Sequence, residues 1–200
     1  DNTVQGSVDE GSIEKHVLPN GLTVLIKEDH TFPLVSLRLS AQGGVRQETE
    51  ERNGLSQMMS SAWIKGTKNY SANQIAEKTE SLGMGLGSFS GRNSFGISME
   101  FLAEQLPIAL DLFKEVIIHP AFPEEEIEKI RETTKAAIRQ REDNIFKSTA
   151  FVLRKELFPT HSYRLEHEGT LETVDAIQRK DLAGFYGRLA VPGNMVMTVF

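Results

Sequence analysis

The stretch from Gly43 to Thr67, GGVRQETEERNGLSQMMSSAWIKGT, marks a change from strand to helix and decides the fold. Before it, residues 34–41 alternate apolar and polar side chains, which predicts a half-buried strand that ends at the glycine pair. Within it, Leu55, Met58 or Met59, and Ala62 fall at helical spacing, so we predict a helix over residues 54–65. The chain therefore combines strands and helices.

A hairpin is predicted upstream of this stretch. Asn20-Gly21 separates two apolar runs, residues 13–18 and 22–28, and both turn residues tolerate a positive φ. The polar residues 1–12 before it are predicted to be a linker or a disordered start.

Further elements follow downstream in the order helix, strand, four helices and strand. Ser71 and Gln74 have the spacing of a capping box at the start of the first of these helices. The predicted ranges are 71–83, 95–101, 107–118, 124–143, 148–158, 181–190 and 195–200. Hairpins and long helical crossovers together predict an α/β or two-layer α+β fold with a mixed, largely antiparallel sheet of about five to six strands. We expect residues 13–200 to form a single domain, cut from a longer chain.

Composition excludes several classes of function. The 200 residues carry 28 acidic and 22 basic side chains, a net charge of −6, which disfavours nucleic acid as a partner. No apolar run approaches the roughly 20 residues that a membrane span needs. The absence of cysteine excludes disulfides, thiolate metal sites and cysteine nucleophiles.

Three sets of residues invite a chemical role and have a simpler explanation. No two of the five histidines have the helical spacing of a metal pair, and His161 and His167 lie six residues apart. The glycines at 83, 85, 87 and 91 lack the Lys and Ser or Thr of a phosphate loop, so they are predicted to allow close approach of backbone or of a neighbouring chain. The acidic run 124–128 is typical of a solvated helix start.

Short motifs along the chain resemble, in register, those of the insulinase and pitrilysin metallopeptidases. The resemblance begins with Gly54-Leu55-Ser56 and Lys65-Gly66-Thr67, which match the two ends of that family's zinc helix. It covers nearly all of residues 13–200, and the other matching segments are Leu18 to Leu22, Phe122 to Glu126, Ala137 to Asn144, His161 to Tyr163, Gly169-Thr170, Phe185-Tyr186 and Pro192 to Met195.

In this family the zinc helix carries His-x-x-Glu-His, and a glutamate on the next long helix completes the protein ligands. The resemblance places Gln57 at the first histidine, Ser60 at the glutamate and Ser61 at the second histidine. Ala137 falls at the distal glutamate. Zinc prefers imidazole, thiolate or carboxylate, so the resemblance implies a degenerate motif with no catalytic residue, no metal ligand and no cofactor in this domain.

The resemblance implies the N-terminal domain of a catalytically inactive half. Such a half would complete the substrate chamber of an HxxEH-bearing catalytic half, fused or separate, and would help to bind peptide; zinc is expected in that partner. An alternative is a structural or assembly protein similar to respiratory-complex core proteins. A third is another hydrolytic activity, with Ser60 or Ser61 as nucleophile. For location, the resemblance favours a bacterial cell envelope or periplasm over the cytoplasm.

Overall fold

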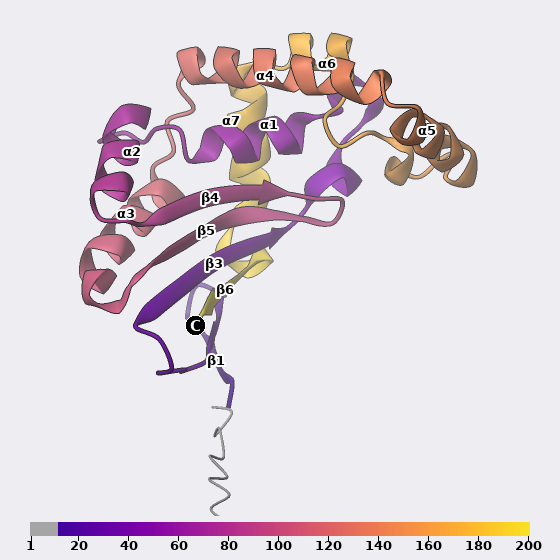
Figure 1. Ribbon diagram of the computed structural model, residues 1–200. Helices are drawn as coiled ribbons and strands as arrows, with labels where there is room; N and C mark the ends of the chain where they lie inside the picture. The colour runs from indigo at the N-terminus through magenta and orange to yellow at the C-terminus, as the bar shows by residue number, and fades with distance from the viewer. Residues whose placement is uncertain (1–11) are drawn as a thin grey trace, which may run out of the picture.

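The computed structural model describes residues 12–200 and contains a six-stranded mixed sheet (Figure 1). The predicted linker, residues 1–12, falls almost entirely outside the described residues. The strand order is β1-β2-β6-β3-β5-β4, and all neighbours are antiparallel except β2 and β6. The strands are β1 (Glu14–Val17), β2 (Thr23–Ile26), β3 (Leu34–Gln42), β4 (Gly85–Ser90), β5 (Ser94–Leu102) and β6 (Met195–Val199). The predicted fold class and sheet are confirmed.

Seven α-helices connect these strands. They are α1 (Leu55–Trp63), α2 (Ala72–Ser81), α3 (Leu106–Ile118), α4 (Glu124–Glu142), α5 (Ile145–Leu157), α6 (Leu171–Ala176) and α7 (Arg179–Leu189). The predicted capping box is present at α2, where Ser71 Oγ accepts from the Gln74 N–H and the Gln74 side chain accepts from the Ser71 N–H.

Alternation along the central strands separates a buried face of the sheet from an open one. Leu37 and Leu39 on β3 and Ile97 and Met99 on β5 are fully or almost fully buried, whereas Arg38 between them on β3 is exposed. The buried side chains of the sheet and of helices α1 to α4, α6 and α7 form one core. Figure 1 shows α1 lying between the sheet and α4, so α1 is the middle layer.

The C-terminal end of α1 is fixed by the only tryptophan of the chain. Trp63 is fully buried, and its indole N–H donates to the Val116 carbonyl at 3.0 Å. Its ring meets Tyr186 edge to face, with ring centroids 5.2 Å apart, and lies 6.0 Å from that of Phe95. These contacts join α1 to α3, α7 and β5.

The structure adds a strand and an α-helix that the sequence pattern does not predict, and it lengthens another helix. Strand β4 occupies most of the glycine-rich segment, and the short helix α6 precedes α7. Helix α5 begins at Ile145, three residues before the predicted start, because the Asn144 side chain caps it by accepting from the Lys147 N–H. None of the helices in residues 12–200 has the length and apolar character that a membrane crossing requires.

Candidate functional site

Helix α1 is held in place by a carboxylate at its N-terminus. Glu48 is buried, and its Oε1 accepts from the Ser56 N–H at 2.7 Å while its Oε2 accepts from the Gly54 N–H at 2.8 Å. Oε2 also accepts from Asn53 Nδ2 at 2.8 Å. A negative charge at this position satisfies N–H groups that have no partner within the helix and opposes the positive end of the helix dipole.

Glycine is required where α1 begins. Gly54 has φ +92°, and a Cβ atom there would lie 2.6 Å from the Glu168 carbonyl oxygen. The loop at 168–169 therefore packs directly on the start of α1. This contact brings a segment from more than 100 residues later in the chain to the candidate site.

A cavity of about 530 Å³ lies between α1 and α4 and contains three of the four positions named from the sequence. Gln57 and Ser61, one helical turn apart on α1, line it from one side, and Ala137 on α4 lines it from the other. Two residues four positions apart on α1 and one residue on the long helix α4 therefore line the same cavity. Ser60 is 1% exposed and does not line this cavity.

Ser60 lies within the packing of α1. Its hydroxyl oxygen is buried and, among residues 12–200, has no hydrogen-bond partner. The neighbouring Ser56 hydroxyl, one turn earlier, is 3.0 Å from that of Ser90 on β4. Ser60 is therefore part of the packed layer, and its hydroxyl is inaccessible to a substrate.

Two acidic side chains that line the cavity are ion-paired. Glu126 accepts from Lys129 at 2.8 Å, and Glu168 accepts from Arg141 at 2.9 Å. Hydrogen bonds to Glu125 and Glu126 raise the pKa of Lys129 above its usual value. His167, which the sequence analysis leaves without a role, also lines the cavity. The proximity of residues 167–168 to α1 depends on long-range packing and has no local sequence signal.

The residues of this cavity do not fit a zinc ion. Of the four positions named from the sequence, the three that line it offer a neutral amide, a hydroxyl and a methyl group, beside Glu126, His167 and Glu168. The first two are poor zinc ligands, and the third is no ligand. Across residues 12–200, no three His, Cys, Asp or Glu side chains come close enough together to hold a metal ion.

Strand β4 provides a free sheet edge beside α1. It pairs only with β5, so the backbone groups on its other edge have no strand partner among residues 12–200. Nothing lies within 4 Å of the position that a Cβ atom would take at Gly85, and only the Ser98 hydroxyl, at 3.5 Å, approaches that position at Gly87. Such an edge accepts an extended peptide through backbone hydrogen bonds.

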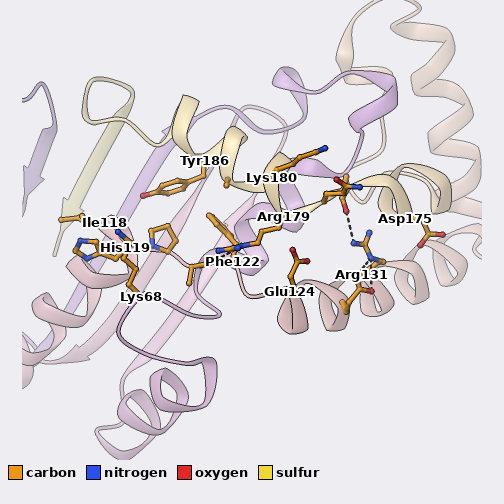
Figure 2. A pocket seen from close by; sticks show the side chains of 16 residues that line it. Lys68, Ile118, His119, Phe122, Glu124, Arg131, Asp175, Arg179, Lys180 and Tyr186 are labelled. Atoms are coloured by element: carbon orange, nitrogen blue, oxygen red, sulfur yellow. Dashed lines mark hydrogen bonds and ion pairs between the residues drawn. The ribbon is translucent and has the colours of Figure 1, made fainter.

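A larger cavity, of about 840 Å³, lies near the N-terminal end of α4 and contains none of the four predicted positions (Figure 2). Two arginines that line it hydrogen-bond to backbone carbonyls. Arg131 donates to the Val174 and Ile177 carbonyls, and Arg179 donates to the Ala121 carbonyl. Burial raises the pKa of Tyr186, whose hydroxyl donates to the Ile117 carbonyl, to about 12. These hydrogen bonds therefore hold α3, α4, α6 and α7 together around the cavity.

Relatives of the chain carry names from two kinds of protein. It is 26% identical over 187 residues to an uncharacterized zinc protease, YmxG, of Bacillus subtilis, covering 94% of the chain and 46% of that protein. It is 24% identical over 176 residues to a non-peptidase homolog, YmxG, of Helicobacter pylori, covering 88% and 41%. Subunit 1 of the mitochondrial cytochrome b-c1 complex of Rattus norvegicus is 26% identical, over 90% of the chain and 38% of that subunit.

A solved structure shares the fold. The peptidase M16 inactive domain from Pseudomonas fluorescens superposes with a TM-score of 0.89 at 24% identity, over 94% of this chain and 46% of that one. The chain spans less than half the length of each of these relatives. The family model of insulinase, peptidase family M16, matches residues 23–169. The chain therefore belongs to the insulinase family of peptidases, M16.

Proposed function

We propose that this chain is a zinc-less, non-catalytic domain of an M16 peptidase that completes the substrate chamber of a catalytic, HxxEH-bearing half and helps to bind peptide. One observation supports the proposal: Gln57, Ser61 and Ala137, which the family resemblance places at ligand positions, line one cavity between α1 and α4. These three side chains are poor zinc ligands or no ligand at all. The names of the Helicobacter and Pseudomonas relatives agree with this assignment.

Peptide binding is supported by the position of the free edge. Strand β4 lies against α1, and its outer edge pairs with no strand among residues 12–200. A peptide added to this edge would run past the α1–α4 cavity, where hydroxyl, amide and charged groups line the wall. Such a surface binds an extended chain without cutting it.

The experiment combines metal analysis with a cleavage assay. The purified chain is expected to hold no stoichiometric zinc and to leave a quenched fluorescent peptide intact. Added to the HxxEH-bearing homologue of the same organism, it is expected to raise the cleavage rate at least ten-fold. Stoichiometric zinc in the chain, or cleavage by the homologue that is independent of it, would refute the proposal.

A structural or assembly role is the second candidate, because subunit 1 of a respiratory complex is among the relatives. Stable association with unrelated proteins, together with no effect on the homologue's cleavage, would favour it. A serine hydrolase is disfavoured by geometry: Ser60 is buried, and no hydrogen bond joins Ser60 or Ser61 to a histidine within residues 12–200. Failure of a fluorophosphonate to label either serine would remove it.

A further inference from the structure

Helix α5 presents an apolar face to solvent. It is the only α-helix in residues 12–200 with no buried residue. The exposed fractions of its apolar side chains reach 84% for Phe146 and 73% for Ile145. Its other exposed large apolar side chains are Val152 at 59%, Leu153 at 57% and Leu157 at 64%. These five residues, spaced over three turns, share one side of the helix and are called the α5 face below.

The opposite side of α5 holds it to the domain through polar and aromatic contacts. Arg154 forms an ion pair with the buried Glu166, and the Ser148 hydroxyl donates to the Glu142 carbonyl at 3.1 Å. Beyond the end of the helix, Phe158 meets Tyr163 edge to face at 5.6 Å. The orientation of α5 is therefore fixed, and its apolar side points outward.

The α5 face is connected to the free edge of the sheet. The turn after β4 is tied to the loop that supports α5, because Arg92 donates to the Tyr163 carbonyl at 3.0 Å and to the Leu165 carbonyl at 3.3 Å. Tyr163 in turn packs on Phe158 at the end of α5. Figure 1 shows α5 on the side toward which the β4 arrow points. A peptide that pairs with β4 and extends past Ser90 would therefore approach α5.

We infer that the α5 face binds apolar side chains of an extended peptide whose backbone pairs with the edge of β4. The inference rests on the proposed function and adds a preference to it: peptides with leucine or phenylalanine beyond the β4-paired segment. Strand β4 has six residues. A peptide that pairs along the whole strand and also reaches the α5 face must therefore be longer than six residues.

Charge agrees with a neutral peptide as the occupant. The one acidic residue of the helix, Glu156, lies among the residues of the α5 face at helical spacing, four residues after Val152. Lys147 and Lys155 lie outside that face, and Lys155 packs over the Phe151 ring at 4.5 Å. An anionic membrane is a poorer occupant, because the chain as a whole carries a net charge of −6. A second copy of the chain would bury the α5 face but leave the connection to the β4 edge without a role.

Two fluorescent peptides test the inference. Both carry the same neutral, six-residue strand-forming centre; three leucine and phenylalanine residues flank it at each end in one, and serine and glutamine in the other. The apolar-flanked peptide is expected to bind the full chain at least ten-fold more tightly. In F146S/L153S this ratio is expected to fall to about one, with the affinity for the polar-flanked peptide unchanged.

The matched control is F32S/I108S, which removes apolar side chains that are 73% and 53% exposed outside α5, and it is expected to keep the ratio. Circular dichroism confirms that each variant is folded. An unchanged ratio in F146S/L153S would overturn the inference while leaving peptide binding by β4 intact. Failure of both peptides to bind would overturn the inference together with the proposed peptide binding.

If the ratio of the two affinities does not change, two further measurements identify a different occupant of the α5 face. Sedimentation equilibrium that shows a dimer of the chain, lost in F146S/L153S, would make the occupant a second copy. Binding to phosphatidylglycerol vesicles that is lost in the same variant would make it a lipid surface. Either result, with the ratio unchanged, overturns the inference.

Discussion

Glu48 and Ser56 are joined by a hydrogen bond of 2.7 Å, in which the buried carboxylate accepts from the backbone N–H of the first turn of α1. The same carboxylate accepts two more hydrogen bonds, so it fixes the helix that carries the degenerate motif. The position of α1 over the sheet thus depends on a residue outside the motif.

Replacing Glu48 is expected to destabilise the chain. E48A leaves the buried donors at Gly54 and Ser56 unsatisfied and is expected to lower the free energy of unfolding by about 2–4 kcal/mol. E48Q retains one acceptor and should fall between E48A and the native chain. Urea unfolding measures the change, and E50Q, at the neighbouring exposed position, is the control. Equal stability of E48A and E50Q would contradict the role assigned to Glu48.

Restoring ligands should restore a metal site if the four positions are those of the family's motif. The variant Q57H/S60E/S61H/A137E is expected to bind one zinc ion per chain, because two imidazoles and a carboxylate then face the α1–α4 cavity. Elemental analysis after dialysis against a weak chelator measures this. The triple variant without A137E should bind zinc more weakly, and a folded quadruple variant without zinc would show that the positions are assigned wrongly.

Arg131 joins α4 to the segment around α6. Its guanidinium is buried and donates to the Val174 and Ile177 carbonyls. R131M keeps much of the apolar stem but leaves both carbonyls without a donor, so the free energy of unfolding is expected to fall by about 2–4 kcal/mol. K129M, which removes an exposed ion-paired lysine on the same helix, should cost no more than about 1 kcal/mol. Similar losses in both variants would argue against this role.

Tyr186 should make stability depend on alkaline pH. Burial raises its pKa to about 12, so the folded state favours the neutral phenol. This contribution is complete below the tyrosine pKa of the unfolded chain, about 10, and is lost as the pH rises through the folded value. Absorbance at 295 nm is expected to show one late tyrosine titration that Y186F lacks. A Y186F titration curve that still contains the late step would assign that step to another tyrosine.

Local patterns were sufficient for most of the fold. The Asn20-Gly21 turn, the alternation in β3 and β5 and the capping box of α2 each depend on neighbouring residues, and the corresponding elements are present. Strand β4 has no such signal, since its glycines and serines have low strand propensity. Its pairing with β5 and the packing of α1 against it make it a strand.

Part of the candidate site could likewise be predicted from local sequence patterns, and part of it could not. Helical spacing brings Gln57 and Ser61 to one face, and the structure places Ala137 opposite them. The burial of Ser60 and the presence of His167 follow from tertiary packing, which brings the 167–169 loop against the start of α1. No periodicity within either segment encodes that contact.

The buried indole of Trp63 at the end of α1 provides an intrinsic fluorescence signal for the folded state. Because Trp63 is the sole tryptophan and touches α3, α7 and β5 at once, its emission spectrum registers any loosening of the helix layer around the α1–α4 cavity. Unfolding of the variants described above can therefore be followed by intrinsic fluorescence, without a label.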